Sequence, residues 1–244
     1  EKMGLKGHKE NTEALGFSER MKKMFHMKEK FAEIPEKEVL TEILQSDMEN
    51  IRGTMESLDK DAFSMAAELI QNAKKIYIVG IRSCEPLADF LGFYLNMLFD
   101  EVHVVRTNSA SEIFEQLMRI GAGDVLIGIS FPKYSMRTVK AMELANSRTA
   151  GVISITDSIH SPLNLYSSCN LIARSEMASV VDSLTAPLSV INALIVALCL
   201  KNQDSLKQSI ETLDQLYDDY QIYGRDEMDP SGGEIEIFHQ GSRV

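Results

Sequence analysis

The chain has few cysteines, and their spacing suits neither disulfide pairing nor metal binding. Cys84, Cys169 and Cys199 lie far apart and form neither a CxxC pair nor a metal-ligand cluster with the five histidines. An odd number of scattered thiols is not typical of a disulfide-stapled secreted protein, so we expect reduced cysteines in a cytoplasmic protein. Neither a metal ion nor a cofactor is predicted.

Long apolar runs and an excess of basic residues are also missing. The most apolar stretch, residues 193–200, is far shorter than the roughly 20 residues that span a bilayer, and the sequence shows no signal segment. We therefore expect neither secretion nor a membrane partner. The formal net charge of −11 repels nucleic-acid phosphates, so this stretch of chain is predicted to bind DNA poorly by itself.

The sequence does contain enough apolar material for one folded core. Of its 244 residues, 44% are hydrophobic and 25% are charged, a balance typical of a globular domain. Residues 37–74 carry apolar side chains at steps of three and four, which predicts two amphipathic helices. In the link between these helices, Asp59 or Asp61 is placed to cap the second one.

Five short apolar runs, each followed by a polar turn and a helical pattern, occupy the middle of the chain. Their residues are 76–79, 102–105, 125–129, 152–155 and 170–173. Continuous apolarity is typical of strands covered on both faces, so we predict an α/β fold. It has a five-stranded parallel sheet with helices on both faces and an amphipathic helical segment before it, and we take the strand order to be the flavodoxin-like 2-1-3-4-5.

Two helices are predicted after the fifth run. Residues 187–200 form a strongly apolar helix opened by Pro187, which we interpret as a core or self-association helix. Residues 203–223 form an amphipathic helix. Beyond them, residues 234–238 are either a short edge strand or disordered.

Hydroxyl and basic side chains follow the first and third predicted strands, in residues 80–85 and 130–138. In the expected strand order these turns meet at the topological switch point, where helix N-termini favour anions. Each serine alone is well explained as a helix cap, but their coincidence favours an anion pocket. The turns fit neither GxGxxG nor GxxxxGK[ST], which disfavours a nicotinamide or nucleoside triphosphate site.

Three segments carry a family resemblance: IYIVGIRS at 76–83, DVLIGISFPKYS at 124–135 and ISITDSIHSPL at 153–163. Together they resemble a sugar isomerase (SIS) phosphosugar-binding domain, in the form found in RpiR-type transcriptional regulators. The resemblance runs from about residue 47 to residue 223. The first ten residues resemble the end of the family's helix-turn-helix domain, which implies that most of that DNA-binding domain lies outside this sequence.

The resemblance also assigns site residues. Ser83 falls on the serine that contacts the sugar phosphate, and Ser130 and Ser135 fall on the first serine and the threonine of the family's Ser-x-Ser-Gly-x-Thr turn. Pro132 and Lys133 replace its second serine and its glycine, and Lys133 offers a compensating charge. The candidate ligand contacts are therefore Arg82, Ser83, Ser109, Ser130, Lys133 and Ser135. Ser109 is equally explained as a helix cap.

These matches imply a division into three parts. Residues 1–36 are a remnant of the DNA-binding domain and its linker, residues 37–223 the SIS domain with flanking helices, and residues 224–244 an acidic, flexible tail. The implied function is an effector-sensing domain that binds a sugar phosphate and controls DNA binding through a homodimer or homotetramer, with DNA contacted only by the absent domain.

One alternative is a structural oligomerisation module that binds no ligand. The other is a phosphosugar isomerase or epimerase, which needs a general base near the sugar. We assign no catalytic residue. His103 is expected to be packed in the second strand and His160 to face solvent, while Glu85, Glu176 and Asp182 are carboxylates whose distance from the sugar is open. Cys84, next to Ser83, is interpreted as a packed side chain rather than a nucleophile.

Overall fold

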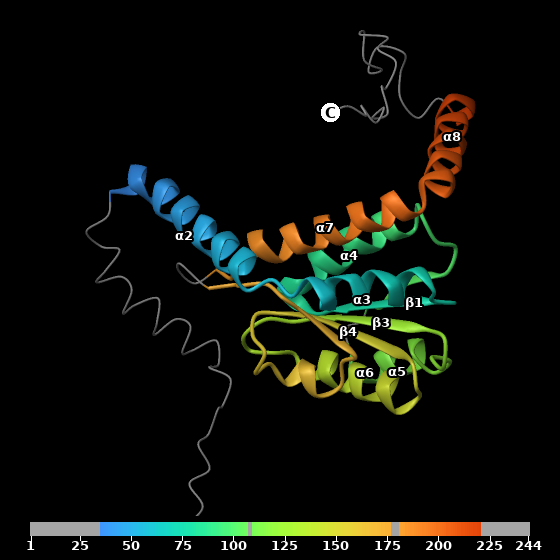
Figure 1. Ribbon diagram of the computed structural model, residues 1–244, viewed down its shortest axis with the longest axis horizontal. Coiled ribbons are helices and arrows are strands. Elements are labelled where there is room, and N and C mark those ends of the chain that lie inside the picture. The colour runs from blue at the N-terminus through green and yellow to red at the C-terminus, as the bar shows by residue number, and fades with distance from the viewer. Residues whose placement is uncertain (1–34, 107–108, 177–180, 221–244) are drawn as a thin grey trace, which may run out of the picture. The chain divides into compact units, whose positions relative to one another are not determined.

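The computed structural model describes residues 35–106, 109–176 and 181–220 (Figure 1). The chain divides into two compact units, the first ending at Asn202 and the second beginning at Gln203. The predictions for the first ten residues, for the tail at 224–244 and for the strand at 234–238 lie outside the described residues. The division into three parts stays a prediction.

The first unit is built around a five-stranded parallel sheet. Its strands are β1 (Ile76–Gly80), β2 (Val102–Val104), β3 (Val125–Ile129), β4 (Gly151–Thr156) and β5 (Cys169–Ile172). They lie in the order β2-β1-β3-β4-β5, which confirms the predicted topology. The predicted strand ends are correct to within one residue.

Burial follows the apolar runs in the three central strands, β1, β3 and β4, whereas the edge strands β2 and β5 are only partly buried. All five residues of β1 and of β3 are buried, as continuous apolarity predicts. The prediction that His103 is packed inside a covered strand is wrong, because β2 is the edge of the sheet and 47% of the His103 side chain is exposed. The His103 ring stacks on Tyr77 instead, and its Nε2 lies 3.1 Å from Glu101 Oε2.

Helices cover both faces of the sheet (Figure 1). One face carries α3 (Lys60–Gln71), α4 (Glu85–Leu95) and α7 (Thr185–Lys201). The other carries α5 (Ala110–Gln116), α6 (Met136–Ser147) and the short 3-10 helix η2 (Pro162–Leu165). A buried cluster joins this second layer to the sheet, with Ile113, Leu117 and Met142 among its fully or almost fully buried side chains.

The helix boundaries have local causes. Asp59 caps α3 by accepting hydrogen bonds from the backbone N–H groups of Asp61 and Ala62, so the capping prediction is confirmed for Asp59. The late apolar helix α7 begins at Thr185 rather than at Pro187, which is its third residue. Proline is tolerated there because the first N–H groups of a helix have no intrahelical partner.

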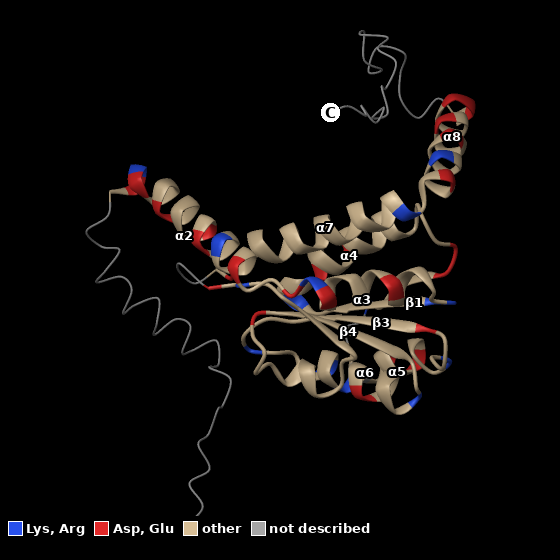
Figure 2. Ribbon diagram, viewed as in Figure 1, with Lys and Arg blue, Asp and Glu red and all other residues tan. Residues whose placement is uncertain are grey.

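Helix α7 is almost free of charge. Its only charged residue is the last one, Lys201, and Figure 2 shows the rest of the helix in tan. Val190, Ile191, Leu194 and Leu198 are buried in the interior of the first unit, to which α7 belongs. Taken singly, none of the described helices combines the length and the apolarity that crossing a membrane requires.

Two further helices are described, one in each unit. Helix α2 (Glu36–Glu56) precedes α3, and its buried residues Asn50, Gly53 and Thr54 all lie in its C-terminal half. Helix α8 (Gln203–Tyr220) forms the described part of the second unit. It is amphipathic, as predicted for 203–223, and the last three residues of that prediction are not described.

Candidate functional site

The reversal of strand order places β1 beside β3, and their carboxyl ends are in register at Gly80 and Ile129. The turns that follow these two strands enclose a pocket of about 430 Å³. Its lining consists of Ile81, Arg82, Ser83, Cys84, Ser130, Phe131, Pro132, Lys133, Tyr134, Ser135, Met136, Arg137 and Asp182. Five of the six predicted ligand contacts therefore lie around one pocket.

The turn after β1 is a short 3-10 helix, η1 (Arg82–Cys84), that leads directly into α4. A Cβ on Gly80 would lie 2.5 Å from the carbonyl oxygen of Cys84, so the strand end and the turn pack backbone to backbone. The exposed hydroxyl of Ser83 donates a hydrogen bond of 3.1 Å to Oδ2 of Asp182. The Ser83 hydroxyl of this turn is therefore paired with Asp182, a residue far away in the sequence.

The turn after β3 is fixed by its own residues. Ser130 is buried, and its Oγ accepts a hydrogen bond of 3.0 Å from the backbone N–H of Ser135. Ser135 is the N-cap residue of α6, yet its hydroxyl makes no capping hydrogen bond. The first N–H groups of α6 and the Ser135 hydroxyl are thus both left for a ligand at the positive end of the helix.

Each of the two turns contains a basic residue with a positive φ. Arg82 has a φ of 61° and Lys133 a φ of 73°, a left-handed conformation that costs a residue with a side chain roughly 1–2 kcal/mol. Lys133 falls on the glycine of the family's turn, so the backbone there has kept the shape that glycine usually supplies. Strain of this kind clusters at ligand sites, and here both strained residues are cations on the same pocket.

The charge balance of the lining favours an anion. Arg82, Lys133 and Arg137 supply three cationic groups, and the Nζ atom of Lys133 is buried. Asp182 is the single carboxylate among the described lining residues, and no histidine occurs among them. Together with the N-termini of α4 and α6, this lining suits a phosphate monoester attached to a polar body.

Tyr134 ties the second turn to the next strand. Its hydroxyl donates a hydrogen bond of 2.9 Å to Asp157, which directly follows β4. Burial, followed by this bond to a carboxylate, raises the pKa of Tyr134 to about 12. The phenol therefore stays protonated near neutral pH and acts as a fixed wall of the pocket.

Cys84 is packed, in line with our interpretation from the sequence. It is buried, and burial raises the pKa of its thiol to about 11. Because the thiolate is the nucleophilic form, Cys84 is a poor nucleophile near neutral pH.

Two other candidates, the serine Ser109 and the carboxylate Glu176, lie outside the pocket lining. Ser109 is the N-cap residue of α5, where the Glu112 N–H donates to its hydroxyl over 3.4 Å, and it is absent from the pocket lining. The peptide of Glu176 is bonded to Asn50 of α2, away from the pocket. Our predicted ligand contacts do not include Tyr134 or Arg137, and they name Asp182 only as a carboxylate at an open distance from the sugar, which the structure places in the pocket lining. A signal for Arg137 was its place in the first turn of the helix after Ser135.

A second hollow, of about 580 Å³, lies between the edge strand β2 and α5. Its lining mixes Lys75, His103 and Arg119 with Glu115, so it has no strong charge preference. It does not adjoin the carboxyl ends of β1 and β3, and we assign the ligand pocket to the switch point.

Comparison with known proteins identifies the family to which the chain is similar. A family model described as SIS domain matches residues 69–197. Two curated relatives are each 27% identical to the chain: an HTH-type transcriptional regulator of Caldanaerobacter subterraneus subsp. tengcongensis, over 186 residues, and the HTH-type transcriptional regulator HexR of Escherichia coli (strain K12), over 193 residues. The matches cover 73% and 74% of the chain and 64% of each relative, so the chain spans less than two thirds of either regulator.

Solved structures share the fold. The sugar isomerase domain of an RpiR transcription factor from Sphaerobacter thermophilus matches with a TM-score of 0.70 at 24% identity, over 73% of this chain and 99% of that one. Vibrio vulnificus NanR complexed with ManNAc-6P matches at 0.64 with 17% identity, over 78% and 74%. Phosphoheptose isomerase GmhA from Neisseria gonorrhoeae matches at 0.58 with 17% identity, over 66% and 98%.

Proposed function

This chain belongs to the SIS domain family, and we propose that it is the effector-sensing domain of a transcriptional regulator. It binds a phosphosugar in the pocket between the turns after β1 and β3. Binding changes the arrangement of its oligomer, and through that the DNA-binding domain that such regulators carry. The proposal is supported by two matched relatives that are HTH-type transcriptional regulators, and by a structural neighbour that holds a sugar phosphate.

One observation carries the ligand assignment: two strained cationic residues and two helix N-termini converge on one pocket. Arg82 and Lys133 stand at the ends of neighbouring strands, next to Ser83 and Ser135. Oriented N–H groups and hydroxyls at fixed positive charge are what a phosphate group needs. The sugar then extends toward Asp182, a carboxylate able to accept hydrogen bonds from sugar hydroxyls.

Sensing is favoured over catalysis by the same lining. An isomerase must move a proton between sugar carbons, which calls for a base and an acid with pKa values close to the working pH. Among the described lining residues, Asp182 is the one candidate for a base, and Tyr134 keeps its proton to about pH 12. The likeness in fold to phosphoheptose isomerase makes turnover the second candidate, which the experiment below separates.

The oligomer is proposed to form through apolar helix faces. Helix α7 packs beside both α2 and α4, and all three expose large apolar side chains. The largest exposures are at Leu40 and Met55 of α2, Phe93 of α4, and Val196 and Leu200 of α7. Extended apolar patches of this kind mark association surfaces, so a second copy of the chain is the expected partner. Light scattering at micromolar concentration should give twice or four times the mass of one chain.

The ligand assignment is tested by thermal unfolding of the chain with hexose, pentose and amino-sugar phosphates, beside their unphosphorylated parents. A ligand at 100 times its dissociation constant adds about 2.7 kcal/mol to the free energy of unfolding. Stabilisation by one phosphosugar and not by its parent supports the phosphate pocket. Incubating that compound with the chain and following its conversion separates a sensor from an isomerase.

The site is tested by the double variant Ser83→Ala, Ser135→Ala. Losing two hydroxyls that meet a charged phosphate should weaken binding by about 10- to 100-fold, without unfolding the chain. Ser147→Ala, at the other end of α6, is the matched control, since its hydroxyl bonds only within its own helix. Undiminished affinity in the double variant would refute the assignment. Ser109→Ala, measured alongside, decides whether the sixth predicted contact takes part.

A further inference from the structure

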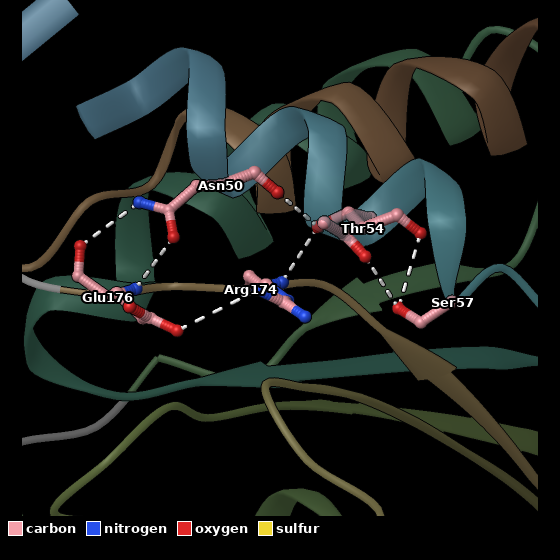
Figure 3. A network of polar contacts seen from close by, with 6 residues as sticks. Asn50, Thr54, Ser57, Arg174 and Glu176 are labelled. Atoms are coloured by element: carbon pink, nitrogen blue, oxygen red, sulfur yellow. Dashed lines mark hydrogen bonds and ion pairs between the residues drawn. The ribbon is translucent and has the colours of Figure 1, made fainter. Parts of the chain in front are cut away.

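The segment after β5 is hydrogen-bonded to α2 at Arg174, Glu176 and Ser183. The backbone N–H of Arg174 donates to the Thr54 hydroxyl over 2.9 Å. The Asn50 side chain donates to the carbonyl of Glu176 over 3.0 Å and accepts from the N–H of Glu176 over 3.1 Å (Figure 3). These non-local contacts join the buried side chains of Asn50 and Thr54 to the backbone of the segment, and they hold α2 in one register on it.

The packing at this contact is close. A Cβ on Gly53 would lie 2.5 Å from the guanidinium carbon of Arg174, so the helix surface is shaped to admit that side chain. Thr54 is also satisfied in the opposite direction, because its hydroxyl donates to the Asn50 carbonyl over 2.7 Å. Helix α2 is therefore docked on specific side chains, and any movement of the segment breaks particular bonds.

The same segment returns to α2 just before α7. Both carboxylate oxygens of Asp47 are used there, since the hydroxyl of Ser183 donates to Oδ1 over 2.6 Å and that of Thr185 donates to Oδ2 over 2.9 Å. The Ser175 hydroxyl donates to the Ser183 carbonyl over 2.7 Å, which joins the two described ends of the segment.

Asp182 is adjacent to Ser183 and lines the ligand pocket. Its Oδ2 accepts the hydroxyl proton of Ser83. A hydroxyl has one proton to donate, so Ser83 cannot serve the Asp182 carboxylate and a ligand phosphate at once. Two anions at one hydroxyl also repel each other.

We propose that Asp182 is a built-in competitor for the ligand phosphate, and that its displacement from Ser83 is transmitted to helix α2 through the Ser183 and Thr185 hydroxyls on Asp47. The inference rests on the proposed function and adds a route from the pocket to the helix that leads toward the N-terminal part of the chain. A ligand biases this route by its different affinity for the two positions of Asp182.

The competitor is tested by titrating the chain with inorganic phosphate and measuring the dissociation constant by calorimetry. Asp182→Asn removes the charge and keeps the shape, and we expect it to bind phosphate about tenfold more tightly than the parent chain. Asp100→Asn is the control for net charge, because Asp100 lies before β2, at the opposite end of the sheet from the pocket. It should leave the dissociation constant unchanged.

The transmission is tested by amide hydrogen exchange in residues 47–57. Saturating phosphate should speed exchange there severalfold in the parent chain, because the bonds from Ser183 and Thr185 to Asp47 are loosened. Asp47→Ala removes both acceptor oxygens, and the double variant Ser183→Ala, Thr185→Val removes both donor hydroxyls, so each should abolish the phosphate response. Glu49→Gln, which disturbs only the exposed pair with Arg52, should retain it.

The outcomes separate the two proposals. If phosphate binds neither the parent chain nor Asp182→Asn, the pocket itself is wrong and both proposals fail. If phosphate binds both with equal affinity, the proposed function stands and the competitor is refuted. If Asp182→Asn binds more tightly but exchange in residues 47–57 ignores phosphate, the transmission to α2 is refuted.

Discussion

The turn after β1 and the turn after β3 each offer a serine, a cation at positive φ and a helix N-terminus, but different bonds hold them. Ser130 accepts from Ser135 within its own turn, and its hydroxyl is buried. Ser83 is exposed and donates to Asp182, 99 residues further along the chain.

The difference assigns different roles to the two turns. A locally closed turn keeps its shape whether or not a ligand is bound, so the β3 turn provides a preformed cradle. A turn whose hydroxyl is shared with a remote carboxylate changes partner when a ligand arrives, so the β1 turn is where binding can be converted into movement.

The largest expected effect on stability comes from a substitution that adds a side chain where the end of β1 packs against the turn that follows it. Gly80→Ala places a Cβ 2.5 Å from the backbone oxygen of Cys84, which cannot move without shifting the turn. We expect a loss of about 3 kcal/mol in the free energy of unfolding, measured by urea denaturation.

The β3 strand offers the matched comparison. A Cβ on Gly128 would collide with the sulfur of Met142, but a methionine side chain can change its rotamer. Gly128→Ala should therefore cost clearly less than Gly80→Ala. Equal losses of unfolding free energy in the two variants would mean that the close backbone contact between Gly80 and Cys84 does not make the β1 turn less tolerant of a side chain.

The same contrast explains how much of the site the sequence could predict. Apolar runs and polar turns record local burial, and they are enough to place the five strands and the turns containing Ser83 and Ser130, whereas the strand order is taken from the flavodoxin-like arrangement of such sheets. The contact of Ser83 with Asp182 depends on how the chain returns after β5, for which local periodicity carries no signal. His103 was misplaced for a related reason, since its strand has an apolar pattern but lies at the sheet edge.

The next effect separates the two serines by stability. Ser130→Ala leaves the part-buried N–H of Ser135 without its partner, so we expect a loss of about 1–2 kcal/mol in unfolding free energy together with weaker phosphosugar binding. Ser83→Ala removes an exposed hydroxyl and should weaken binding at nearly unchanged stability. Urea denaturation measures the stability of both variants, and calorimetry measures their binding. Equal stability losses would contradict the assignment of a structural role to Ser130 and not to Ser83.

The cation of the β3 turn gives a smaller effect with an internal control. Lys133→Gly and Lys133→Ala both remove the ammonium group, so both should weaken phosphate binding to the same extent. Only glycine relaxes the φ of 73°, and the glycine variant should be about 1 kcal/mol more stable than the alanine variant. If alanine were as stable as glycine, the backbone at this position would not be strained.

The smallest effect concerns the thiol that lies where the two turns meet. Burial raises the pKa of Cys84 from 9.0 to about 11, while a hydrogen bond from the Phe131 backbone in the β3 turn acts in the opposite direction. Between pH 9 and pH 11 the unfolded chain has lost this proton and the folded chain still holds it, so unfolding free energy falls as pH rises. It is unaffected by this group below pH 9. By pH 10 this thiol lowers the unfolding free energy of the parent chain by about 1 kcal/mol. Cys84→Ala has no thiol at this position, so its unfolding free energy should fall by about 1 kcal/mol less over the same pH range. Parallel stability curves for the two proteins between pH 8 and pH 10.5 would mean that the thiol is not enclosed between the turns.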